Sequence, residues 1–111
     1  MKGELNEKAN SNHFVHRIIE NVLYDNYHHY LQCEELPDLK NVEYKFSKYQ
    51  DTVKQIEDLA EGLVTIQVDA DSCPGKGSIL ISYPSNAIRK QIESILGGKT
   101  FYGIPVTLIN Q

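Results

Sequence analysis

Two acidic side chains, placed two residues apart, are the first candidates for chemistry in this chain of 111 residues. Asp69 and Asp71 follow a segment of alternating apolar residues, and two carboxylates in such a position can hold Mg²⁺. Sites of this kind lie at the carboxyl edge of a parallel sheet and use further acidic ligands. Because this chain is expected to continue into an antiparallel hairpin, we interpret the two aspartates as a solvated acidic loop.

Histidines are the second candidates for metal chemistry, and all of them fall in one segment that is expected to be helical. These residues are His13, His16, His28 and His29. The pair His16 and Glu20 has the i,i+4 spacing that can chelate a metal. A zinc site needs three or four converging ligands, whereas about three helical turns separate the two histidine pairs. The sequence therefore predicts no metal, no cofactor and no catalytic residue.

The two cysteines, Cys33 and Cys73, lie far apart and in no metal-ligand spacing. Such usage is typical of a reducing compartment, where thiols persist, so we expect free thiols rather than a disulfide. The first residues contain no apolar signal core, and no window approaches the roughly 20 apolar residues that span a bilayer. A cytoplasmic protein without a membrane partner is therefore expected.

The net charge of −4 presents no general basic field to a nucleic acid. A partner that carries phosphate would have to be held by a local group of basic residues in loops and at helix ends. The candidates for that role are Lys76, Arg89, Lys90 and Lys99.

The N-terminal region is expected to contain a long amphipathic helix. Residues 1–9 are polar and expected to be flexible. Residues 10–36 carry apolar side chains at steps of three and four, which predicts a helix that Pro37 ends. The apolar stripe of this helix is the predicted partner-binding surface, and it comprises Val15, Ile18, Ile19, Val22, Leu23 and Tyr27.

Residues 41–111 are expected to form one folded domain. Alternating apolar and polar residues predict four strands, at 42–46, 63–69, 78–83 and 105–109. Helical spacing and terminal glycines predict helices at 48–61 and 84–96. Pro105 at the head of the last strand suggests an edge position. This βαββαβ order is that of the ferredoxin-like α+β fold, an antiparallel sheet with two helices on one face.

The segment from Lys76 to Tyr83 resembles the third-strand signature of the RNA recognition motif, a family with this fold. The positions that agree are Lys76, Gly77, Ile81 and Tyr83. In that family, bases stack on aromatic side chains at the third and fifth positions, which here are Ser78 and Leu80. The resemblance implies the fold, but the stacking energy of about 1–3 kcal/mol per base is missing. Binding of RNA on the sheet face is therefore not expected.

The expected surfaces favour an interaction protein. Two helices already cover the apolar face of the expected sheet, and its other face is polar, so the stripe of the N-terminal helix needs another cover. We expect a non-enzymatic protein–protein interaction or regulatory module that forms a homo-oligomer through this helix or binds another protein. The alternative is a nucleic-acid-binding domain, similar to the RNA recognition motif, that uses loops rather than the sheet face.

Overall fold

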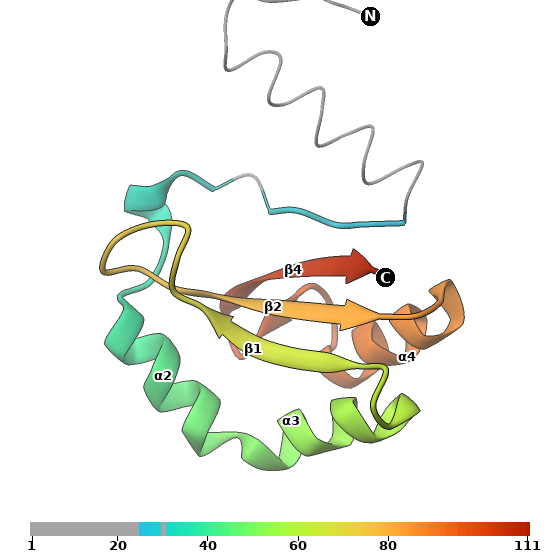
Figure 1. Cartoon of the computed structure of the whole chain (residues 1–111). Helices are drawn as coiled ribbons and strands as arrows, with labels where there is room; N and C mark the ends of the chain where they lie inside the picture. The colour runs from blue at the N-terminus through green and yellow to red at the C-terminus, as the bar shows by residue number, and fades with distance from the viewer. Residues whose placement is uncertain (1–24, 30) are drawn as a thin grey trace, which may run out of the picture.

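The computed structural model describes residues 25–29 and 31–111 (Figure 1). Within these residues the chain forms an α+β fold with three α-helices and one four-stranded sheet. In chain order, the elements are the 3-10 helix η1 (Cys33–Glu35), α2 (Leu39–Lys48), α3 (Gln50–Glu57), the 3-10 helix η2 (Asp58–Ala60), β1 (Thr65–Asp69), β2 (Ser78–Tyr83), α4 (Asn86–Leu96), β3 (Thr100–Phe101) and β4 (Ile104–Asn110). None of the described helices is long and apolar enough to cross a membrane.

The sheet is mixed, with the strand order β1-β2-β4-β3. β1 and β2 form an antiparallel hairpin, and β3 and β4 form another. β2 and β4 run parallel, with Ile79 opposite Val106 and Ile81 opposite Leu108, and α4 makes the crossover between them. The three helices lie on one side of the sheet, and residues 25–29 run along β4 (Figure 1). One face of the sheet is therefore covered by helices of the same chain.

The expectation of a first strand at 42–46 is wrong, because these residues lie inside α2. In a strand, Val42 and Tyr44 would both face the core. Instead, Val42 is fully buried while Tyr44 is 63% exposed. Val42 and Phe46 are four residues apart and so share one helix face. A segment of five residues is too short to distinguish the helical period from the strand period. The ferredoxin-like strand order is consequently not observed, and neither is an all-antiparallel sheet.

The other predicted elements occur close to their predicted positions. β1, β2 and β4 correspond to the strands predicted at 63–69, 78–83 and 105–109, and α3 and α4 to the two helices. Local signals explain α4, since the Ser85 hydroxyl accepts a hydrogen bond from the Ile88 amide and Gly97 ends the helix with φ +76°. The edge position of Pro105 is wrong, because β4 lies between β2 and β3. The proline stands before the first pair with β2 and faces only the short β3.

The described part of the expected N-terminal helix is not α-helical. Residues 25–29 form no helix, and Tyr27 exchanges two backbone hydrogen bonds of 2.8 Å with Leu108 of β4. Residues 33–35 form only the short η1. Residues 10–24, with most of the predicted stripe, lie outside the described part, as do residues 1–9. Tyr27 therefore belongs to a segment that adds to the edge of β4, where free backbone groups were available.

The core lies between the sheet and the helices and draws on every described strand. Ile79, Ile81, Val106 and Leu108 are fully buried in it. The hairpin loop also packs closely on α2, because a Cβ at Gly77 would stand 3.1–3.2 Å from Leu39 and Val42 atoms. This close approach explains why the position is a glycine.

The expectation of free thiols is wrong, since Cys33 and Cys73 form a disulfide with a Cα–Cα distance of 5.6 Å. The described chain contains no other cysteine. The bond became possible because the chain before α2 folds back onto the β1–β2 hairpin. There, Pro37 accepts a hydrogen bond from the Gly77 amide and Leu39 donates one to Gly75. The spacing of the two cysteines in the sequence could not predict that they meet, because their distance depends on how the chain folds.

Candidate functional site

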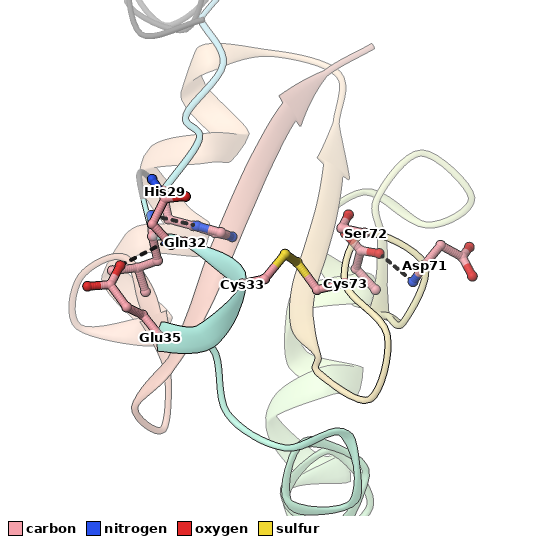
Figure 2. The surroundings of a disulfide bond; sticks show 9 residues. His29, Gln32, Cys33, Glu35, Asp71, Ser72 and Cys73 are labelled. Atoms are coloured by element: carbon pink, nitrogen blue, oxygen red, sulfur yellow. Dashed lines mark hydrogen bonds between the residues drawn. A yellow bond between two sulfur atoms is a disulfide. The ribbon is translucent and has the colours of Figure 1, made fainter. Parts of the chain in front are cut away.

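A pocket of about 420 Å³ opens on the sheet face that the helices leave uncovered. Its floor is formed by side chains of β2 and β4, among them Leu80, Thr107 and Ile109. Residues of the segment before α2, such as Leu36, form one wall, and the hairpin loop forms the other. Both halves of the Cys33–Cys73 disulfide line it (Figure 2). Its size is in the range of small-molecule or side-chain sites in proteins.

Local hydrogen bonds shape both walls of this pocket. Gln32 donates its amide to the Glu35 carboxylate at 2.8 Å, which caps η1. In the hairpin loop, the Asp69 carboxylate accepts from the Ser72 hydroxyl at 2.8 Å and from the Asp71 amide at 3.1 Å. The Asp69 side chain therefore organises its own loop. In the described ranges, no three His, Cys, Asp or Glu side chains are grouped so as to hold a metal ion.

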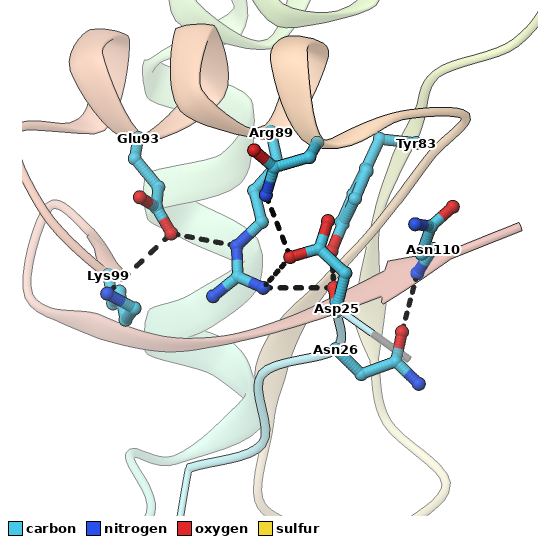
Figure 3. Close-up of polar contacts among 8 residues, drawn as sticks. Asp25, Asn26, Tyr83, Arg89, Glu93, Lys99 and Asn110 are labelled. Carbon is cyan, nitrogen blue, oxygen red and sulfur yellow. Dashed lines mark hydrogen bonds and ion pairs between the residues drawn. The ribbon is translucent and has the colours of Figure 1, made fainter. Parts of the chain in front are cut away.

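A polar cluster between α4 and the segment that begins at Asp25 centres on Arg89 (Figure 3). Its guanidinium pairs with Asp25 at 2.9 Å and with Glu93 at 3.0 Å, and it also donates to the Asp25 carbonyl. Asn86 donates to the same Asp25 carboxylate at 2.9 Å, while Lys99 lies 3.6 Å from Glu93. The Arg89 side chain is only 13% exposed, so this cluster is a partly buried anchor rather than a surface patch.

Two side chains of this cluster, Tyr83 and Arg89, keep their protons at neutral pH. Burial raises the pKa of Tyr83 to about 12, so its hydroxyl is a permanent hydrogen-bond donor at neutral pH. Burial alone lowers the pKa of Arg89, but interactions with Glu93 and Tyr83 outweigh this, and the net shift is upward. Both groups keep one protonation state in the physiological range, whereas a general acid or base needs a pKa near the working pH.

A third surface lies where α2 and α3 meet the β3–β4 turn, and we call it the tyrosine surface. Tyr49 and Tyr102 stack with ring centroids 3.5 Å apart and planes 7° from parallel. The Lys48 ammonium lies 5.8 Å from the centre of the Tyr44 ring and 5.4 Å from that of Tyr49. Lys45 donates to the Tyr102 carbonyl at 2.9 Å. The tyrosine surface consists of Tyr44, Lys45, Lys48, Tyr49 and Tyr102.

The basic residues named as the nucleic-acid alternative do not form one surface. Arg89 and Lys99 share Glu93, and Arg89 faces a second carboxylate on Asp25. Lys76 pairs separately with Asp38 at 3.1 Å, and Lys90 is exposed on α4. Carboxylates therefore already neutralise three of the four cations, which weakens this set as a phosphate-binding group.

Of the predicted partner-binding residues, Tyr27 alone falls in the described part of the chain, where it is half-buried against the core with Lys99 over its ring. The others, Val15, Ile18, Ile19, Val22 and Leu23, lie outside it. Sequence reasoning missed the pocket and the tyrosine surface. Neither has a local signal, because each joins residues from distant parts of the chain. The chain matches no protein-family model, no curated protein and no solved structure.

Proposed function

We propose that the protein is a non-enzymatic interaction module that self-associates through the apolar stripe of its N-terminal region. The observation that carries this proposal is the core of the described residues: within 25–29 and 31–111, the main buried cluster runs from Val42 to Leu108. Of the stripe, Tyr27 packs against the margin of this core. The other five members of the stripe precede the described residues in the sequence, and each is worth about 1.5–3 kcal/mol when fully buried.

The junction between the stripe and the domain supports the same proposal. Asp25 is held by Arg89 of α4 and by the hydroxyl of Tyr83 at the end of β2. Asn26 accepts a hydrogen bond from the Asn110 amide at 2.7 Å, and Tyr27 pairs with β4. Residues 25–27, which include the last member of the stripe, are thus fixed at the edge of the sheet. A fixed junction lowers the entropy that is lost when two copies associate.

Sedimentation equilibrium of the full chain tests this proposal with two neighbouring substitutions. Val22→Asp places a charge in the stripe, whereas Asn21→Asp adds the same charge about 100° away on the predicted helix. We expect the wild-type chain and Asn21→Asp to form the same oligomer, and Val22→Asp to sediment as a monomer. A monomeric wild-type chain, or equal association of both variants, would refute self-association through the stripe.

A further inference from the structure

We propose that the tyrosine surface binds single-stranded nucleic acid, with bases stacked on its rings and phosphates beside its lysines. This inference concerns a different face of the molecule from the N-terminal stripe and does not depend on self-association. It also differs from the set of basic loop residues considered from the sequence, because its rings come from α2, the α2–α3 junction and the β3–β4 turn.

The rings of this surface are unusually accessible. Tyr44 is 63% exposed and Tyr102 is 44% exposed, although large aromatic side chains are normally well covered. Tyr49 stacks on the Tyr102 ring, Phe101 meets it in a T-shaped contact with centroids 5.0 Å apart, and Tyr102 still keeps 44% of its surface exposed to a ligand. A base can extend such a stack, and base–aromatic stacking tolerates every base because each has a π face.

The backbone at Tyr102 holds the ring in an unfavourable conformation. Tyr102 has φ +52° and Gly103 has φ +87°, which makes them the two central residues of the β3–β4 turn. Asn-Gly is the preferred sequence there, because asparagine tolerates positive φ better than a bulky residue does. The Tyr102 hydroxyl lies 2.6 Å from that of Thr52, and Lys45 binds the Tyr102 carbonyl. A strained residue that is fixed by its neighbours and exposed to solvent points to a binding role.

The charge of the surrounding helix favours an anionic ligand. α2 contains three lysines, Lys40, Lys45 and Lys48, against one acidic residue, Glu43, and so has a net charge of +2 in a chain of −4. Asp51 is the acidic residue in the first turn of α3. Phosphates that approach these lysines release counterions, which drives binding at low salt.

A hollow beside Tyr44 provides room for a planar group. It has a volume of about 330 Å³ and is lined by Asn41, Tyr44, Lys45 and the Gly103 turn. An acidic peptide would satisfy the lysines but would leave the exposed surface of Tyr44 and Tyr102 unused. A nucleic-acid strand uses both features, since it alternates planar bases with phosphates. For this reason we favour single-stranded nucleic acid over an acidic peptide as the ligand.

Fluorescence anisotropy with labelled oligothymidine and oligouridine of about 12 nucleotides tests the proposal on the full chain. We expect wild-type binding at low salt that weakens steeply as salt is added. Tyr102→Asn removes the ring but suits the positive φ, and Tyr44→Ala changes an exposed side chain, so both should fold. Each should weaken binding roughly 5- to 150-fold, the equivalent of about 1–3 kcal/mol per stacked base.

Matched controls separate stacking on this surface from general effects. Leu63→Ala removes an equally exposed apolar side chain elsewhere and should leave affinity unchanged. Lys48→Gln should weaken binding, whereas Lys54→Gln, which removes a lysine paired with Asp58, should not. No anisotropy change with the wild-type chain, or ring variants that bind as tightly as wild type, would overturn the proposal. Ring-dependent binding of oligoglutamate that exceeds oligonucleotide binding would overturn it in favour of an acidic peptide.

Discussion

Tyr83 and Asp25 are joined across 58 positions of sequence by a hydrogen bond from the Tyr83 hydroxyl to the Asp25 backbone carbonyl. Tyr83 is the last residue of β2 and is fully buried, while Asp25 opens the segment that pairs with β4. The bond therefore ties the start of the described chain to the centre of the sheet, beside the guanidinium of Arg89 (Figure 3).

This relationship predicts a loss of stability at alkaline pH. The pKa of Tyr83 is 10.0 without the fold and about 12 within it, because burial disfavours the phenolate. Between these two values only the unfolded chain loses the proton, so the free energy of unfolding falls as pH rises. The contribution is fully present below pH 10 and amounts to about 2–3 kcal/mol, which is lost by about pH 12.

Urea unfolding of the wild-type chain and Tyr83→Phe between pH 9 and 12 measures this effect. Phenylalanine cannot titrate, so the variant should start less stable, by about 1 kcal/mol for the lost hydrogen bond, but should decline less over this range. The other tyrosines and the lysines titrate in both proteins, so their contributions cancel when the free energy of unfolding of the variant is subtracted from that of the wild type at each pH. Parallel curves would contradict a raised pKa at Tyr83.

Arg89→Met is expected to lower the free energy of unfolding by about 2 kcal/mol. The variant keeps much of the side-chain volume but leaves Asp25 and Glu93 without their shared cation. One Asp25 oxygen is already buried without a described partner, so the remaining carboxylate is costly to desolvate. Lys90→Met on the exposed side of α4 is the control and should change stability by less than about 0.5 kcal/mol. Chemical unfolding of both proteins tests this, and equal stability would show that the ion pairs are not an anchor.

Reduction of the Cys33–Cys73 bond is expected to destabilise the domain. The bond closes a loop of 40 residues, for which chain entropy gives about 4 kcal/mol. Urea unfolding with and without dithiothreitol measures this difference. The double variant Cys33→Ser and Cys73→Ser should have the stability of the reduced wild type and should not respond to dithiothreitol. A wild-type chain with the same stability in both conditions would contradict the disulfide.

Glu43→Pro distinguishes a helix from a strand at residues 42–46. Glu43 is exposed in the interior of α2, so proline there removes a helical hydrogen bond and should cost about 3 kcal/mol or more. Glu43→Ala removes the same carboxylate and should change stability by no more than about 0.5 kcal/mol. Urea unfolding followed by far-ultraviolet circular dichroism gives both values. An edge strand would tolerate the proline, so a small loss of stability in Glu43→Pro would contradict a helix at these residues.

Much of the domain was predictable from sequence because its signals are local. The β2 pattern of Ile79, Ile81 and Tyr83 fixes which side of that strand is buried, whatever strand lies beside it. Ser85 and Gly97 mark both ends of α4 through contacts within the helix itself. These elements required no knowledge of distant residues.

By itself, then, the sequence determined β1, β2, α3, α4 and β4 and the apolar character of the N-terminal stripe. Tertiary structure alone decided that residues 42–46 are helical, that β2 lies parallel to β4, and that Cys33 meets Cys73. It also decided that Tyr49 stacks on Tyr102. Two physical reasons apply: a segment of five residues fits both the helical and the strand period, and contacts between distant residues exist only once the chain has packed.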